Sequence, residues 1–189
     1  KYEDVSTGAV IITGDTARKE NAREVLQALS GMAGDFVVAT AGPDLESIIA
    51  GKGSGAYSFS EEKNTDIVNF DIGGGTTNIV IFNRGEVEDT TCLDIGGRLI
   101  KFDEEGNIKY IFKKMNDIAE DVGVNLILGK RVSEGEIRKI CKRMAEIVLE
   151  SVKLLPRTEL YKKIVTYKDF RKEIPKVRHL SFAGGVADY

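Results

Sequence analysis

The chain has 189 residues, which is enough for one good domain or two small lobes. With 42% hydrophobic residues, 30% charged residues and a formal net charge of −3, its composition is that of an ordinary globular protein and implies no general affinity for nucleic acid or anionic membranes. No apolar run approaches the roughly 20 residues of a membrane span. Cys92 and Cys141 lie far apart without a CxxC pattern, so we expect buried thiols in a reducing compartment.

The first part of the chain predicts a strand–helix–strand unit. Two apolar runs, Gly8–Gly14 and residues 35–42, predict strands that are buried on both faces. Residues 15–31 between them predict a helix, whose apolar face is formed by Ala22, Val25, Leu26 and Leu29. Because a crossover of this kind connects parallel strands, we expect the two strands to be parallel.

A short helix and a polar stretch come next. A proline at position 43 favours a helix start, and Leu45, Ile48 and Ile49 then fall on one side of that helix. The glycine- and serine-rich residues 51–64 predict a lobe boundary.

The second half predicts antiparallel strands followed by one long helix. Strands are expected at residues 65–72, 78–82, 86–95, 96–102 and 108–112, with a hairpin turn at residues 83–85. Ser133 and Glu136 form a capping box for a helix that Pro156 is expected to end. Cys141 and Met144 fall on the apolar stripe of this helix, so we interpret them as core packing.

The last residues predict a connector and a final strand. Residues 161–178 are mixed and basic, and the strand after them runs into Gly184 and Gly185. His179 is expected to be a surface or strand-edge residue. The class predicted for the whole chain is α/β with mixed sheets.

The clearest chemical signal lies between the strands at residues 65–72 and 78–82. We call residues 73–77, Gly-Gly-Gly-Thr-Thr, the glycine turn. No lysine follows as in a P-loop, and the next segment is strand-like, unlike the helix of a dinucleotide fingerprint. Glycines still let backbone N–H groups converge on an anion, Thr76 and Thr77 add hydroxyl donors, and Asp71 can hold Mg²⁺. The alternative is a tight β-turn that Asp71 merely caps.

The Asp-x-Gly-Gly-Gly-Thr pattern resembles the second phosphate loop of the superfamily of actin, DnaK-type chaperone and sugar-kinase ATPases. The order of the other parts is similar, since a strand–helix–strand unit and a connecting helix precede it and a strand ending in Gly-Gly follows. The resemblance implies part of an α/β, actin-like ATPase (ribonuclease H-like) fold, with mixed β-sheets and flanking helices. Residues 1–42 would be the C-terminal part of the first lobe, residues 43–60 a connecting helix and linker, and residues 61–189 the second lobe.

A closer resemblance is to the EutA family, the reactivating factors of adenosylcobalamin-dependent ethanolamine ammonia-lyase. It rests on residues 7–22, 69–100 and 181–189. The resemblance implies a chaperone of the bacterial cytoplasm, associated with a metabolic microcompartment. It would use ATP and Mg²⁺ to release damaged cobalamin from the lyase, so that intact cofactor can enter. The implied mechanism is domain movement driven by nucleotide, without chemistry on cobalamin itself.

The resemblance also gives roles to individual residues. Those expected to face the β- and γ-phosphates of ATP or ADP are Gly73, Gly74, Gly75, Thr76 and Thr77. Asp71 would organise Mg²⁺ and the attacking water, and Gly184 and Gly185 would lie against adenosine. The glycine pair, Gly96-Gly97, resembles the pair that follows this phosphate loop in the superfamily, and a simple bend between strands is the equal alternative.

Two departures from the superfamily limit these expectations. Its first phosphate loop, Asp-x-Gly-[Thr/Ser], has no match here, so we expect the strands of that loop to lie before Lys1 and the chain to be a fragment. Because phosphoryl transfer needs charge stabilised from both sides, this chain alone should have very weak or no ATPase activity. The first-lobe strands would also leave an open sheet edge, so we expect either a covering chain, such as a second copy, or a mobile region.

Two other functions stay open. A small-molecule kinase of the same superfamily needs a base beside an acceptor pocket, and Asp71 and Asp94 are the strand-end candidates. A nucleotide-independent interaction module would use the glycine turn only as structure. In the main interpretation the partner is ethanolamine ammonia-lyase, with no nucleic acid and no membrane.

Overall fold

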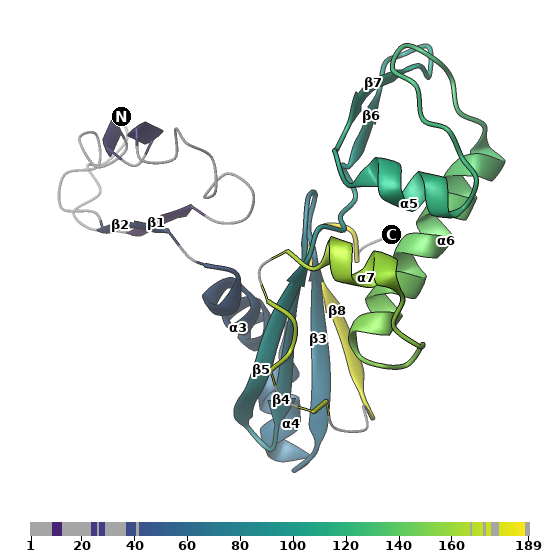
Figure 1. The fold of residues 1–189 in the computed structure, drawn as a ribbon. Coiled ribbons are helices and arrows are strands. Elements are labelled where there is room, and N and C mark those ends of the chain that lie inside the picture. The colour runs from purple at the N-terminus through teal and green to yellow at the C-terminus, as the bar shows by residue number, and fades with distance from the viewer. Residues whose placement is uncertain are drawn as a thin grey trace.

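The computed structural model describes residues 9–12, 24–25, 27–28, 37–40, 42–166, 168–171, 173–174 and 178–187. Within these ranges the strands form three sheets of two, four and two strands, and Figure 1 shows them with the helices. The predicted α/β class with mixed sheets is confirmed. Of the helices in these ranges, none is both long enough and apolar enough to cross a membrane.

The predicted parallel strand pair is confirmed. β1 (Ala9–Ile12) pairs in parallel with β2 (Val37–Thr40). The crossover helix predicted between them has four described residues, and all are helical: Glu24, Val25, Gln27 and Ala28. The other residues of its predicted apolar face lie outside the described residues.

A four-stranded mixed sheet is the centre of the rest of the described chain. Its strands, in the order β5-β4-β3-β8, are β3 (Asp66–Ile72), β4 (Thr77–Asn83), β5 (Glu86–Leu93) and β8 (Leu180–Ala183). β3, β4 and β5 are antiparallel neighbours, whereas β8 is parallel to β3. The predicted hairpin between β4 and β5 is confirmed, because Arg84 and Gly85 have φ values of 54° and 78°, as a type I′ turn requires.

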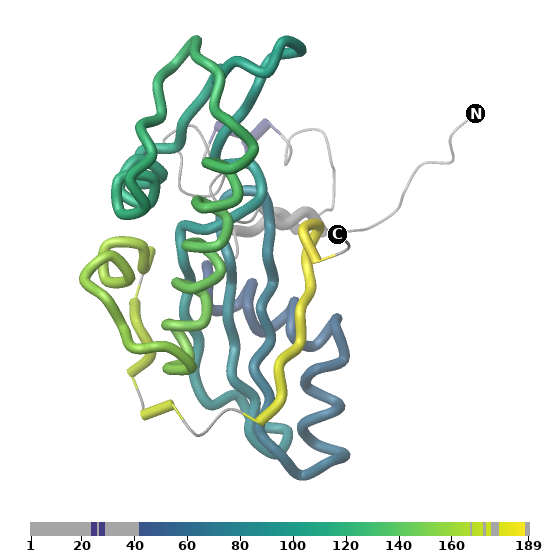
Figure 2. Tube along the Cα trace, turned by 90° about the vertical axis from the view of Figure 1, so that its right-hand side faces the viewer, coloured from purple at the N-terminus to yellow at the C-terminus, as the bar shows by residue number. Residues whose placement is uncertain are grey.

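Apolar side chains cover both faces of this sheet, because side chains alternate along each strand. Along β4, Ile79 and Ile81 point into the larger core, whereas Val80 and Phe82 pack on the opposite face. Figure 2 shows the resulting layers, with α6 (Glu134–Ser151) along one face of the sheet and α4 (Ala56–Glu62) on the other.

The buried face of α3 (Pro43–Gly53) differs from the predicted one. The helix begins at the expected proline and Ile48 packs against the sheet as predicted, but Leu45 and Ile49 are 51% and 49% exposed. Ser47 and Gly51 form the buried side instead. Small residues are needed there, because the helix backbone lies close against the sheet.

Replacing Gly51 with alanine is expected to destabilise the packing of α3 on the sheet. A β-carbon there would lie 2.5 Å from Cε2 of Phe82 and 2.7 Å from Cγ1 of Val80, and both belong to a packed layer. Overpacking costs about 1–3 kcal/mol, which offsets the roughly 1 kcal/mol of improved helix propensity. Urea denaturation should show a lower free energy of unfolding for Gly51→Ala. Gly53→Ala, where no atom lies within 4 Å, should keep or raise it, and equal effects would contradict this packing.

The stretch expected to be a linker is mostly helical. Gly55, with a φ of 84°, turns the chain out of α3 and into α4. Ala56 and Ser60 are buried, and the hydroxyl of Ser60 donates to the carbonyl O of Thr65 at 2.8 Å. This stretch therefore packs on the sheet instead of running free. The lobe boundaries at residues 42 and 60 stay a prediction.

The capping box of α6 is confirmed, but its predicted end is wrong. The hydroxyl of Ser133 accepts from the N–H of Glu136, whose carboxylate accepts from the N–H of Ser133. The helix ends at Ser151, before Pro156 is reached, and Lys153 takes a φ of 57°. A left-handed residue just after the last turn, and not the proline, accompanies the end of the helix.

The remaining elements differ partly from the prediction. β6 (Ile100–Phe102) and β7 (Ile108–Ile111) form the expected hairpin, but as a separate sheet beyond the end of the larger one (Figure 1). The prediction missed α5 (Met115–Asp121) and also α7 (Glu159–Ile164), which takes up the start of the expected connector. The signal for α7 was Thr158, whose hydroxyl caps the helix by accepting from the N–H of Tyr161.

Candidate functional site

The glycine turn and the C-terminal glycines lie at the same end of the sheet. Because β3 and β8 are parallel, their carboxyl ends are neighbours, and Asp71 near the end of β3 pairs with Ala183 at the end of β8. The glycine turn follows β3, and Gly184 follows β8 directly. Open α/β sheets bind ligands beyond the carboxyl ends of such strands, so this end is the candidate site.

Gly184 allows the two loops to approach each other. A β-carbon at this residue would lie 2.5 Å from the carbonyl O of Ile72 and 2.6 Å from Oδ1 of Asp71, and its φ is 88°. The N–H of Val186 also donates to the carbonyl O of Ile72 at 3.3 Å. Gly185 has no atom within 4 Å of the same position. Only the first of the two predicted glycines is therefore required by a close contact in the described chain.

The glycine pair holds the glycine turn from the other side. The N–H of Gly97 donates to the carbonyl O of Gly73 at 3.0 Å, and the N–H of Arg98 donates to the carbonyl O of Gly74 at 2.7 Å. A β-carbon on Gly96 would lie 2.6 Å from the carbonyl carbon and oxygen of Gly74. The pair is thus more than a bend between strands, because it lies in backbone contact with the glycine turn.

The glycine turn carries free backbone donors. Its ends are joined by a hydrogen bond from the N–H of Gly73 to the carbonyl O of Thr76 at 2.9 Å. The N–H groups of Gly74, Gly75 and Thr76 make no hydrogen bond to any other described residue. Successive free N–H groups of this kind are the donors used by phosphate-binding nests.

Thr77 does not have the role expected of its hydroxyl. The side chain is fully buried, and Oγ1 donates to the carbonyl O of Ile95 at 2.8 Å. A hydroxyl has a single proton to donate, so this group is not available to a phosphate. Its bond instead joins the start of β4 to the segment before Gly96, which connects the glycine turn with the glycine pair.

Asp71 is a half-buried carboxylate beside both loops. Burial raises the pKa of its carboxyl group above the ordinary value. Among the described residues, no group of three or more Asp, Glu, His and Cys side chains could hold a metal ion. Asp71 can therefore supply one ligand to Mg²⁺, and phosphate oxygens and water would have to supply the others.

An apolar pocket of about 330 Å³ adjoins the loops. Its lining includes Ile72 at the end of β3, Gly97 and Val186 from the loops, and Cys141 and Met144 from α6. Cys141 is exposed, so its assignment to the core is wrong, whereas Cys92 is buried as predicted. Cys141 is thus on the apolar stripe of α6 but lines this pocket, whereas Met144 also packs against the larger core. Such an apolar pocket suits a flat ring.

Lys114 and Arg98 are two charged side chains near the glycine pair that the sequence analysis did not single out. Nζ of Lys114 pairs with Oδ2 of Asp94 at 2.7 Å, and the Asp94 side chain is 6% exposed. A buried carboxylate in an ion pair is poorly suited to act as a base, so this contact disfavours the kinase interpretation. Arg98 is exposed beside Gly74.

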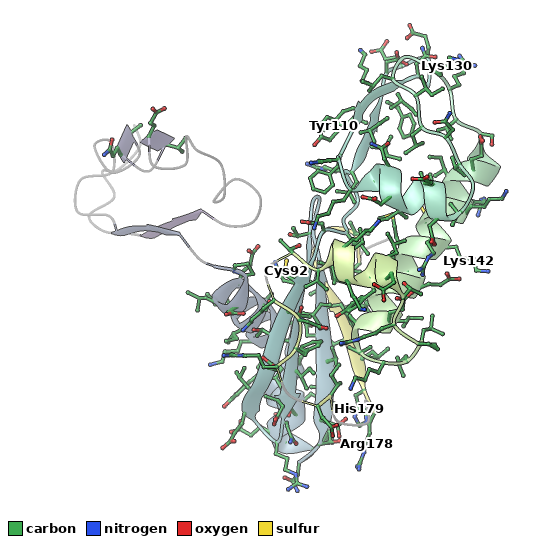
Figure 3. All side chains as sticks on the ribbon, in the orientation of Figure 1. Cys92, Tyr110, Lys130, Lys142, Arg178 and His179 are labelled. Carbon is green, nitrogen blue, oxygen red and sulfur yellow. The ribbon has the colours of Figure 1, made fainter. Side chains whose placement is uncertain are left out.

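The histidine lies away from the site. His179 precedes β8, next to Arg178, and Figure 3 shows both at the end of the sheet opposite the β6–β7 hairpin. Its Nδ1 lies 3.0 Å from the carbonyl O of Asp66, at the start of β3. This confirms the predicted strand-edge position.

A family model and two curated relatives that match this chain share one family name. The family model described as "Ethanolamine utilisation protein EutA" matches residues 1–189. Two curated relatives, named ethanolamine ammonia-lyase reactivase EutA, come from Salmonella typhimurium and Escherichia coli and are 42% and 41% identical over 150 residues. Each match covers 79% of this chain and 32% of the relative, so the chain spans about a third of the length of these relatives.

A solved structure of lower similarity is MreB5 of Spiroplasma citri bound to ADP. It is 19% identical, with a TM-score of 0.46, over 96% of this chain and 58% of that chain. A likeness at this level says nothing about function here, whereas the match to the family model extends over the whole chain. The chain belongs to the EutA family of ethanolamine utilisation proteins.

Proposed function

We propose that this chain is a nucleotide-binding part of an ethanolamine ammonia-lyase reactivase. The observation that carries the proposal is the meeting of Asp71, the glycine turn, Gly96 and Gly184 at one end of the sheet, in a chain of the EutA family. The names of the curated relatives support the reactivase activity. The resemblance of the glycine turn to the phosphate loop of actin-like ATPases supports the nucleotide.

ATP or ADP would bind with Mg²⁺ at this end of the sheet. The free N–H groups of Gly74, Gly75 and Thr76 would donate to phosphate oxygens. Asp71 would hold Mg²⁺ directly or through water, which fits its raised pKa because the cation would compensate the half-buried charge. Adenosine would lie on the side of Gly184 and Gly185, with its ring in the adjoining apolar pocket.

The proposed fold is the actin-like one, in which nucleotide moves one lobe against the other. The proposed partner is ethanolamine ammonia-lyase that holds damaged cobalamin, which is exchanged for intact cofactor. The proposed location is the bacterial cytoplasm, in association with a metabolic microcompartment. Where no other strand pairs with the β1–β2 pair, we propose that a second copy of the chain covers its open edge.

Asp71→Asn is expected to weaken Mg-ADP binding at least about tenfold without loss of stability. The substitution removes a ligand of the metal, and about 1.4 kcal/mol of binding energy corresponds to this factor. An acid whose pKa is raised by folding destabilises the fold as pH rises above its ordinary pKa of 3.8, so a neutral asparagine should keep or raise stability at neutral pH. Calorimetric titration with Mg-ADP and urea denaturation measure the two effects. Unchanged binding would remove Asp71 from the site.

The function itself is tested with the protein at its natural full length. With ATP and Mg²⁺ it should restore a lyase that has been inactivated with cyanocobalamin, and Asp71→Asn should restore it much more slowly. Failure to restore the lyase, with phosphorylation of a small acceptor, would replace the proposal by the kinase. Absence of Mg-ADP binding at millimolar concentration would favour the nucleotide-independent module.

A further inference from the structure

We infer that Arg98 binds the phosphate chain of the nucleotide from the side of the glycine pair. The inference rests on the proposed function, because it takes the ligand of the glycine turn to be a nucleoside di- or triphosphate. The N–H of Arg98 donates to the carbonyl O of Gly74 at 2.7 Å, so the backbone of Arg98 is held beside the glycine turn.

The side chain of Arg98 runs along the glycine turn. Its Cδ, Cγ and Cβ atoms lie 3.3, 3.6 and 3.7 Å from the position of a β-carbon on Gly74. Since Nε is bonded to Cδ, the guanidinium begins one bond away from this contact. Because Gly74 has no side chain, the aliphatic part of the Arg98 side chain can lie directly against its backbone, although Arg98 is exposed.

The guanidinium of Arg98 is available for a ligand. The residue is exposed, and its side chain has neither an ion pair nor a hydrogen bond with any other residue that the structure describes. The nearby Lys114, by contrast, is paired with Asp94. A planar guanidinium can donate two parallel hydrogen bonds to phosphate, which a backbone N–H cannot.

The charges at the site also favour a cation at this position. The phosphate chain and Asp71 are both negative, and Mg²⁺ would neutralise only part of this charge. The positive charge of the Arg98 guanidinium would offset the remainder. It would lie next to the free N–H groups of Gly74 and Gly75, which donate to the same ligand without carrying a net charge.

Arg98→Gln in the protein at its natural full length is expected to raise the dissociation constant for Mg-ADP about tenfold. This is the usual loss when a charge-assisted hydrogen bond is removed. Arg98→Lys should raise it less, about threefold, because lysine keeps the charge but lacks the planar fork. Adenosine binding, followed by ligand-observed NMR, should be the same in the wild type and both variants, because adenosine has no phosphate.

The matched control is Arg84→Gln, an equal charge change on an exposed residue in the hairpin at the other end of β4. It should bind Mg-ADP as the wild type does. If the wild type binds Mg-ADP and Arg98→Gln binds it equally well, the inference is wrong and the proposed function stands. A wild type that does not bind Mg-ADP overturns both. Weaker adenosine binding by Arg98→Gln would likewise overturn the inference, since it would indicate a disturbed site and not a lost phosphate contact.

Discussion

Gly184→Ala is expected to lower the free energy of unfolding by about 3 kcal/mol and to abolish Mg-ADP binding. A left-handed φ costs an alanine about 1–2 kcal/mol, and overpacking adds about 1–3 kcal/mol. The clash would be with backbone, since the new β-carbon would lie 2.5 Å from the carbonyl O of Ile72. It would also lie 2.6 Å from Oδ1 of Asp71, so the carboxylate would be displaced together with the loop. Urea denaturation and calorimetric titration with Mg-ADP measure the two losses.

Gly185→Ala is the matched control for this prediction. The adjacent glycine has no atom within 4 Å of the β-carbon position, and its φ lies outside the left-handed region. Its substitution should change the free energy of unfolding by less than about 0.5 kcal/mol. Similar losses of unfolding free energy at both positions would show that the pair acts through chain flexibility and not through the close approach of the two loops.

Glu150→Ala is expected to cost about 3–5 kcal/mol, because it breaks a buried ion pair. Oε1 of Glu150 lies 2.6 Å from Nη1 of Arg143, and Oε2 accepts from both the N–H and the hydroxyl of Thr158 at 2.8 Å. The Glu150 side chain is 2% exposed and that of Arg143 is 9% exposed. Alanine would leave the guanidinium buried with less compensation, and it would free the start of α7 from α6. Urea denaturation measures the loss.

Glu134→Ala in the same helix is the control for the ion pair. Its carboxylate lies 2.7 Å from Arg138, but the two side chains are 80% and 77% exposed, so the loss should be at most about 1 kcal/mol. Equal losses for the two variants would contradict the importance of burial.

The contribution of Glu150 should also depend on pH in a defined direction. Burial by itself would raise the pKa of this carboxyl group, but the hydrogen bonds from Arg143 and Thr158 outweigh it and hold the pKa below the ordinary value of 4.5. A lowered carboxyl pKa adds stability that is present above the ordinary pKa and is lost as pH falls through the folded-state pKa. The difference between the wild type and Glu150→Ala should therefore shrink as pH falls below 4.5.

Elements with strong local signals lie where the sequence predicted them. The Ser133–Glu136 capping box, the hairpin turn at Arg84-Gly85 and the strands around the glycine turn were predicted in place. These features depend on residues a few positions apart, whose backbone preferences act before any tertiary contact forms. The short helices α5 and α7 were missed, because a six- or seven-residue helix depends more on packing than on its own periodicity.

Predictions of a buried face failed where two elements approach closely. On α3 the predicted face was Leu45, Ile48 and Ile49, but only Ile48 packs against the sheet, where the small residues Ser47 and Gly51 form the buried side. On α6 Cys141 fell on the predicted stripe, yet it lines an open pocket. Hydrophobic periodicity gives the direction of a stripe, but it does not say which part of the stripe another element covers.

The sequence by itself determined the α/β class, the strand–turn–strand setting of the three glycines and the resemblance to the EutA family, because each depends on the order and spacing of residues along the chain. The tertiary structure alone decided which residues meet. The parallel pairing of Asp71 with Ala183 brings Gly184 against β3, although the two strands are far apart in sequence. The same packing commits the hydroxyl of Thr77 to Ile95 and lays Arg98 along Gly74. A side chain's role at this site is set by what lies opposite it, and that is a property of the folded sheet.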